Sequence, residues 1–189
     1  MHRAMRFIAL LLTLMPLPSL GISSAAAQAT DTPPVTSACP TPASRTEIIF
    51  PPPDRFVAPA DLPMRLAEAQ QRWQDSGITS YCINVEYIAF ISYAGPRVLE
   101  VRNGNIVAQP PPCMGGSNRC LSSTERAEDY TVPGLFAFLQ GELSDPGRQV
   151  NLVAFDAMYG YPIWITTDTR SNATDMGRMR VVTSFMPLP

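Results

Sequence analysis

The stretch Phe155–Asp168, FDAMYGYPIWITTD, is the pattern around which the second half of the chain is organised. A short apolar run ends before Asp156, a turn with two tyrosines, a glycine and a proline follows, and a second apolar run ends at Asp168. Two apolar runs separated by a short segment with glycine and proline are typical of a β-hairpin. We therefore expect two antiparallel strands here, joined by an aromatic turn.

A helix is expected before the first group of strands, beginning after Asp61 and ending before Gly77. Asp is a favoured N-cap residue, and glycine is favoured just past a helix end. Apolar residues between them recur at helical spacing and therefore share one face. We expect this face to lie in the core; it consists of Leu62, Leu66, Ala69 and Trp73.

Three strands are expected next. Tyr81–Ile91 alternates apolar and polar side chains, as a half-buried strand does. Gly95-Pro96 predicts a turn. Val98–Arg102 and Asn105–Ala108 flank Asn103-Gly104, the pair preferred in a two-residue type I′ hairpin turn.

The second half repeats this order of elements. Thr131 is a good N-cap for a second helix, and Asp145-Pro146-Gly147 predicts the turn after it. Consecutive strands then follow at hairpin spacing, which favours antiparallel pairing. The predicted strands are Val150–Phe155, Ile163–Thr167 and Met179–Phe185. The predicted fold class is α+β: an antiparallel sheet of about six strands with two helices packed on it, in the order α-β-β-β-α-β-β-β, preceded by a proline-rich arm.

The N-terminus predicts export. Arg3 and Arg6 precede an apolar run, and small residues follow up to Ala29, as in a secretory signal peptide cleaved before Thr30. A membrane anchor is the alternative, but the apolar run is too short to span a bilayer and prolines interrupt it. We expect a signal peptide over 1–29, an extended or disordered proline-rich arm over 30–60 and a single α+β domain over 61–189. The product would be periplasmic or secreted, with no membrane span left after cleavage.

Four cysteines lie beyond the predicted leader, and an even number in an oxidising compartment predicts two disulfides. Cys113 and Cys120 flank the flexible segment MGGSNR, so we pair them with each other. This leaves Cys39 with Cys82. A zinc site built from all four cysteines is the alternative, but the chain lacks the close C-x-x-C pairs of such sites.

The residue types that are missing exclude several chemistries. The one histidine is His2, within the predicted leader, and the sequence contains no lysine. A Ser-His-Asp triad, a Cys-His pair, histidine-ligated zinc or haem and Schiff-base chemistry are therefore excluded. The formal net charge of −2 argues against nucleic acid as a partner. We assign no catalytic residue, no metal ligand and no cofactor.

Three aspartates near the last strands are candidates for chemistry: Asp156, Asp168 and Asp175. Gathered at one end of the strands, they would bind Ca²⁺ or act as an acid–base pair. Alternatively each caps its own turn, because Asp side chains accept hydrogen bonds from nearby backbone N–H groups. We favour the capping interpretation, since no D-x-D-x-D-G loop is present.

The tyrosine turn is the other candidate. Tyr159 and Tyr161 would form an exposed recognition pair, since tyrosine offers rigid contact area. Alternatively Gly160 adopts a positive φ, Pro162 stiffens the turn and both rings pack on the sheet, which is the interpretation we favour. The candidate binding residues are Asp156, Tyr159, Gly160, Tyr161, Pro162, Asp168 and Asp175.

Several positions between about Leu66 and Phe185 resemble an uncharacterised family of secreted or lipid-anchored bacterial proteins, catalogued as a domain of unknown function. The most specific part is the YGYP turn flanked by aspartates. Such proteins often carry a cysteine pair near the end of the first strand, where this chain has Ala89-Phe90. The resemblance implies an exported domain and supplies no activity. The matching positions are Trp73, Tyr81, Asn103-Gly104, Thr131-Val132, Leu135-Phe136, Asp156, Tyr159–Pro162, Asp168 and Asp175.

These observations favour a non-catalytic exported interaction domain that meets a protein partner in the cell envelope through a sheet face or the tyrosine turn. One alternative is a Ca²⁺-binding or carboxylate-dependent enzyme that uses Asp156, Asp168 and Asp175. Another is a structural protein of the envelope. The oligomeric state is not predicted.

Overall fold

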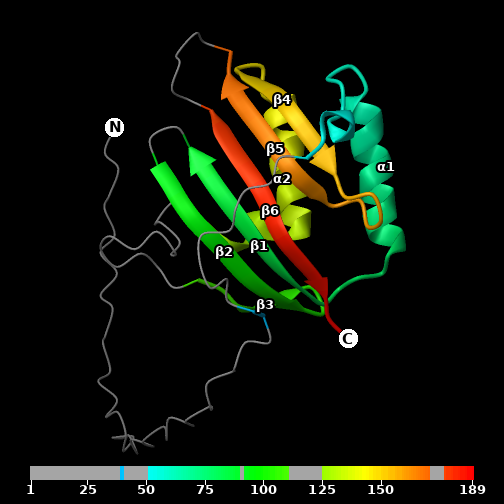
Figure 1. Cartoon of the computed structure of the whole chain (residues 1–189), viewed down its shortest axis with the longest axis vertical. Coiled ribbons are helices and arrows are strands. Elements are labelled where there is room, and N and C mark those ends of the chain that lie inside the picture. Colours follow the sequence, from blue (N-terminus) through cyan, green and yellow to red (C-terminus); the bar gives the residue numbers. More distant parts are fainter. Residues whose placement is uncertain (1–38, 41–50, 90–91, 111–124, 171–176) are drawn as a thin grey trace, which may run out of the picture. The chain divides into compact units, whose positions relative to one another are not determined.

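Two α-helices and six β-strands follow one another in the order helix, three strands, helix, three strands (Figure 1). The structure is a computed structural model that describes residues 39–40, 51–89, 92–110, 125–170 and 177–189. Two short 3₁₀ helices, η1 and η2, precede the α-helices. The elements are η1 Pro53–Arg55, α1 Leu62–Asp75, β1 Tyr81–Ala89, β2 Ser92–Arg102, β3 Asn105–Ala108, η2 Ala127–Tyr130, α2 Val132–Ser144, β4 Arg148–Phe155, β5 Pro162–Thr169 and β6 Arg178–Pro187.

The strands form one sheet in the order β3-β2-β1-β6-β5-β4, and every neighbouring pair is antiparallel. The predicted α+β class, with six strands and two helices in this order, is confirmed. The two halves join where β1 lies beside β6 at the centre of the sheet (Figure 1). This pairing brings together residues about a hundred positions apart, from Tyr81 opposite Pro187 to Ala89 opposite Arg178.

Both α-helices cover the same face of the sheet. The predicted stripe of α1 is buried at Leu62, Leu66 and Ala69, and Trp73 packs against the same core. From α2, the core takes Val132, Leu135, Phe136 and Leu139. Alternate residues of β1 meet these helices, because successive side chains of a strand point to opposite faces. Those core residues are Tyr81, Ile83 and Val85.

The helix ends follow the predicted signals, with one exception. Gly77 lies just past α1 with φ +63°, as a glycine at this position should. The Thr131 hydroxyl accepts a hydrogen bond from the Gly134 N–H at 3.1 Å and caps α2. Asp61 occupies the N-cap position of α1, but its carboxylate makes no capping hydrogen bond. Its own backbone is already helical, at φ −91° and ψ −10°, instead of the extended conformation that aims a capping side chain at the helix.

The first hairpin is confirmed at its turn, where Asn103 and Gly104 have φ of +49° and +77°. The turn predicted at Gly95-Pro96 is wrong, because both residues lie within β2. In the pairing with β1, Arg97 lies opposite Val85 and Ala94 lies opposite Tyr87. Gly95 and Pro96 therefore lie opposite a single residue, Glu86. The extra residue forms a β-bulge, a place in a sheet that tolerates proline.

The remaining predicted boundaries agree with the structure to within a few residues. The Asp145-Pro146-Gly147 turn is confirmed by a hydrogen bond from the Arg148 N–H to the Asp145 carbonyl at 3.0 Å. The strand predicted to end at Ile91 ends at Ala89. No helix in the described part of the chain has the length and apolar character needed to cross a membrane.

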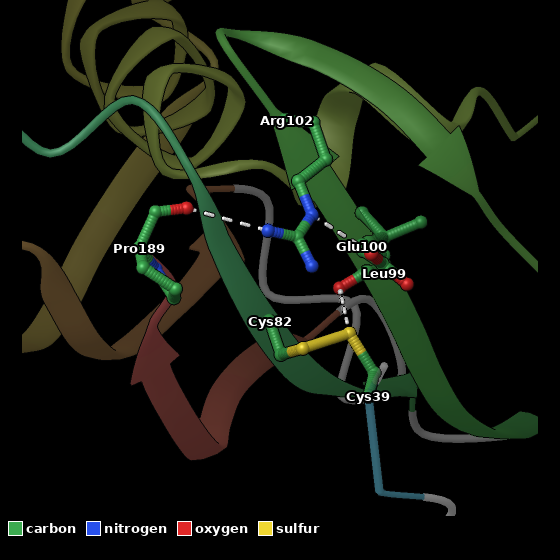
Figure 2. Close-up of a disulfide and its surroundings, with 6 residues drawn as sticks. All are labelled: Cys39, Cys82, Leu99, Glu100, Arg102 and Pro189. Carbon is green, nitrogen blue, oxygen red and sulfur yellow. Dashed lines mark hydrogen bonds and ion pairs between the residues drawn. A yellow bond between two sulfur atoms is a disulfide. The ribbon is translucent and has the colours of Figure 1, made fainter. Parts of the chain in front are cut away.

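The face of the sheet opposite the helices carries the predicted disulfide between Cys39 and Cys82 (Figure 2). Cys82 lies opposite Glu100 of β2, whose carboxylate pairs with the Arg102 guanidinium at 3.0 Å. Arg102 also donates to the carbonyl of Pro189 at 3.4 Å, which ties the C-terminus to this region (Figure 2). The predicted partners Cys113 and Cys120 lie outside the described residues.

Residues that follow η1 pair with the edge strand β4 at the other end of the sheet. The Val57 N–H donates to the Val153 carbonyl at 2.9 Å, and Phe56 forms an isolated antiparallel bridge with Ala154. The Phe56 ring meets the indole of Trp164 edge-on, with 6.1 Å between centroids. The end of the proline-rich segment is therefore packed on the sheet at this point.

Candidate functional site

The tyrosine turn between β4 and β5 is organised by Asp156. Its Oδ1 accepts hydrogen bonds from the N–H groups of Met158 at 3.0 Å and Tyr159 at 2.6 Å. Its backbone closes the turn, because its carbonyl accepts from Gly160 and its N–H donates to the Tyr161 carbonyl. The carboxylate is thus committed to its own turn, as the capping interpretation expects.

The two tyrosines of this turn pack against the sheet. Tyr161 is 8% exposed, and its ring centroid lies 4.4 Å from that of Phe185. The half-buried Tyr159 also meets Phe185, at 6.0 Å. Burial raises the pKa of the Tyr161 hydroxyl above its ordinary value, and the nearby Asp156 charge adds to this shift. Tyr161 is therefore not available as an exposed recognition side chain.

Gly160 explains why the turn has this sequence. Its φ is +83°, and a Cβ at this position would lie 2.3 Å from the carbonyl oxygen of Ala69 in α1. Only glycine combines this backbone conformation with so close an approach of the helix. Pro162 follows as the first residue of β5 and is buried. The YGYP turn is thus a contact between the hairpin and α1.

The structure does not bring Asp156 and Asp168 together. Asp168 lies opposite Gln149 near the far end of β5, and its Oδ1 accepts from the Thr169 N–H at 2.7 Å. At ~3.3 Å per residue, the strand separates the two carboxylates by about 20 Å. Asp175 lies outside the described residues. Among those that are described, no group of three or more His, Cys, Asp or Glu side chains is placed to hold a metal ion.

A groove between α1 and α2 is the surface feature that the sequence did not predict. Its volume is about 320 Å³. The lining side chains are aromatic, aliphatic or amide-bearing, and none of them is charged. They are Gln70, Trp73 and Gln74 of α1 and Pro133, Phe136, Ala137 and Gln140 of α2.

The polar groups of the groove have no partner within the described part of the protein. The side-chain amides of Gln70, Gln74 and Gln140 make no hydrogen bond there, and neither does the indole N–H of Trp73. Gln71 provides a contrast on the same helix, because its amide donates to Asp75 Oδ1 at 2.8 Å. The groove therefore presents a set of uncommitted hydrogen-bonding groups beside apolar surface.

Both walls of the groove are held to the core through Tyr81. Its ring meets the indole of Trp73 edge-on at 5.6 Å, and its hydroxyl accepts a hydrogen bond from the Val132 N–H at the start of α2. Phe185 adds a second edge contact to Trp73 at 5.9 Å. Burial raises the pKa of the Tyr81 hydroxyl above its ordinary value. One core residue thus positions parts of both helices.

A second group of side chains fills the space between η2, α2 and the sheet. The Arg180 guanidinium lies 3.8 Å from the ring centroid of Phe138 and 5.1 Å from that of Tyr130, and it donates to the Asp129 carbonyl at 2.8 Å. Burial lowers the pKa of Arg180 and raises that of Tyr130. Arg97 Nη2 contacts both carboxylate oxygens of Glu125, at 3.1 and 3.0 Å.

The Tyr130 hydroxyl donates to the same Glu125 carboxylate. Glu125 therefore binds both Arg97 and Tyr130, and the Tyr130 ring in turn contacts Arg180. Buried charges are retained in proteins when they are paired in this way. Arg97 and Tyr130 are each 1% exposed, so both side chains are shielded from solvent. This arrangement joins η2 to the sheet.

Sequence reasoning placed Trp73 in the core and missed the groove. Trp73 is half-buried: it contacts the core with its edge and also lines the groove. The available signal was the pair Gln70 and Gln74, four residues apart and flanking Trp73 on the edge of the apolar stripe. The α2 wall carried no comparable signal, because its exposed residues are Pro133, Ala137 and Gln140.

Comparison with known families shows the family to which the chain belongs. Residues 65–187 match the model of a family of unknown function (DUF6174), and the protein belongs to this family. The match runs from the first turn of α1 to the end of β6, and so includes both walls of the groove. The resemblance to a domain of unknown function is confirmed, while export remains a prediction. No curated protein and no solved structure matches the chain.

Proposed function

We propose that this protein is a non-catalytic binding domain that works outside the cytoplasm and holds a protein partner in the α1–α2 groove. The observation that carries the proposal is the set of uncommitted hydrogen-bonding groups beside the indole of Trp73. Tryptophan is enriched among the residues that dominate binding energy, because it buries a large area at little entropic loss. An interaction surface needs such an anchor and polar groups around it.

Binding is favoured over catalysis by the chemistry of the lining. Glutamine, tryptophan, proline, phenylalanine and alanine provide no acid, base or nucleophile at ordinary pH. Of the predicted acidic residues that the structure describes, Asp156 accepts from N–H groups of its own turn and Asp168 accepts from the Thr169 N–H. The groove offers recognition without a group that would react.

Work outside the cytoplasm is supported by two independent features. The leader-like pattern over residues 1–29 predicts export. The Cys39–Cys82 disulfide is of the kind that persists in oxidising compartments. An exported chain whose groove is lined without an acid, base or nucleophile fits a role in holding another envelope protein.

The test is a crosslinking pull-down of the oxidised protein from the cell envelope of its own host. Three exposed alanines allow the same substitution at three places: Ala137→Arg in the groove, Ala60→Arg in the turn before α1 and Ala157→Arg in the tyrosine turn. We expect one stoichiometric partner that is lost only with Ala137→Arg, because an arginine there fills the groove. Loss with Ala157→Arg alone would move the interaction to the turn, and recovery of no partner would contradict the proposal.

A further inference from the structure

We infer that the segment held in the α1–α2 groove is a proline-rich stretch of the partner in the polyproline II conformation. This inference rests on the proposed function and specifies the chemistry of its ligand. Proline-rich segments are recognised by aromatic-lined grooves, where ring faces meet proline rings and side-chain donors meet backbone carbonyls. The groove of this protein has both kinds of group.

The hydrogen-bonding character of the groove matches such a segment. The one polar group fixed on a rigid ring is the indole N–H of Trp73, which can only donate. Proline has no N–H, so a proline-rich backbone presents carbonyl acceptors only. The amides of Gln70, Gln74 and Gln140 supply further donors along the two walls. Each amide also carries an acceptor, and its N–H₂ donor can pair with a carbonyl of the ligand.

The size of the groove also favours a ligand that is already ordered. A volume of about 320 Å³ lies at the lower end of the roughly 300–1,000 Å³ seen for ligand pockets. So small a groove offers few contacts. The conformational entropy that a flexible peptide loses on binding would offset much of the favourable free energy of those contacts. Polyproline II is preformed in solution, so a proline-rich segment loses less conformational entropy on binding.

The absence of charged side chains in the lining argues against a charged peptide as the ligand. No Arg, Asp or Glu lines it, so a phosphorylated, acidic or basic segment would lose hydration there without gaining an opposite charge. Apolar surface from Pro133, Phe136 and Ala137 is available to the uncharged rings of proline. A neutral saccharide shares the absence of charge, and the experiment distinguishes it.

The experiment follows the indole N–H signals of the ¹⁵N-labelled, oxidised protein during titration with blocked decaproline. The protein has two tryptophans. Trp164 is buried, and its indole donates to Thr166 Oγ1 at 2.9 Å, so its signal is an internal reference. We expect a saturable shift of the Trp73 signal while the Trp164 signal stays in place. A Gly-Ser peptide of equal length and maltohexaose are titrated in parallel.

The alanine variants make the result specific. Ala137→Arg should weaken decaproline binding roughly tenfold or more, because it fills the groove, and Ala60→Arg should leave it unchanged. No Trp73 shift with decaproline, an equal shift with the Gly-Ser peptide, or a shift with maltohexaose instead would each overturn the inference. If the pull-down nevertheless recovers a partner that is lost with Ala137→Arg, the proposed function is supported and only the proline-rich ligand is wrong.

Discussion

The tyrosine turn and the α1–α2 groove both carry aromatic side chains, yet they differ in what their polar groups do. In the turn, Asp156 accepts from two backbone N–H groups, and Tyr161 is buried against Phe185. In the groove, three amides and an indole N–H have no partner among the described residues. The difference shows that a conspicuous motif can be structural, while the groups without a partner lie in the groove that we propose as the binding surface.

The largest expected effect belongs to Gly160→Ala in the turn. The variant places a Cβ against the Ala69 carbonyl at a backbone φ of +83°. Strain and overlap together should lower the free energy of unfolding by about 3–5 kcal/mol. Urea unfolding followed by circular dichroism measures the change. Gly141→Ala is the control: it lies in α2 with open space around it, so we expect a gain of up to about 1 kcal/mol from helix propensity.

A smaller loss is expected for Asp156→Ala. The variant leaves the N–H groups of Met158 and Tyr159 without their acceptor, which should lower the free energy of unfolding by roughly 1–3 kcal/mol. Asp156→Asn keeps an oxygen at the same place and should recover most of the loss. If both variants unfold at the same urea concentration, the carboxylate charge and not the turn geometry is the important property.

Alkaline pH tests the burial of Tyr161. Its pKa is raised in the folded protein, so the unfolded chain loses the proton first as pH rises above ~10. The contribution of this group to stability is complete below that pH and falls by up to about 1.4 kcal/mol per pH unit above it. Tyr161→Phe should therefore show a shallower decline of stability between about pH 9 and 11. An unchanged slope in urea unfolding would mean that the hydroxyl is solvated.

The smallest effect on stability is expected in the groove. Gln74→Ala removes an exposed amide without a partner, so the free energy of unfolding should change by less than about 0.5 kcal/mol. The same variant should weaken partner capture in the pull-down. Gln71→Ala is the matched control, because it removes an amide already bonded to Asp75 and should leave capture intact. Equal capture by both variants would place the interaction elsewhere.

Most of the secondary structure was predicted correctly because its signals are local. The Asn103-Gly104 turn, the Thr131 cap and the Gly77 stop each depend on a few neighbouring residues. The wrong turn at Gly95-Pro96 shows the limit of such signals. Pairing of β2 with β1 continues on both sides of this dipeptide, and the sheet absorbs it as a bulge.

The candidate site was less predictable for the same reason. Sequence reasoning found the turn at Tyr159–Pro162 and the capping interpretation of Asp156, since both depend on adjacent residues. It could not place Asp168 relative to Asp156, because that depends on the direction and length of β5. The groove was missed because its walls lie some sixty positions apart in the chain, as Trp73 and Pro133 do.

Local sequence was sufficient for the order of the helices and strands, for the apolar face of α1 and for the caps at Thr131 and Asp156. Those properties follow from side-chain direction along a local backbone. Tertiary structure alone decided that β1 lies beside β6, that Gly160 meets α1 and that Gln70 and Gln140 face one groove. Such neighbours are set by which buried faces pack together once the whole sheet has formed, and contacts between distant residues leave no local pattern in the chain.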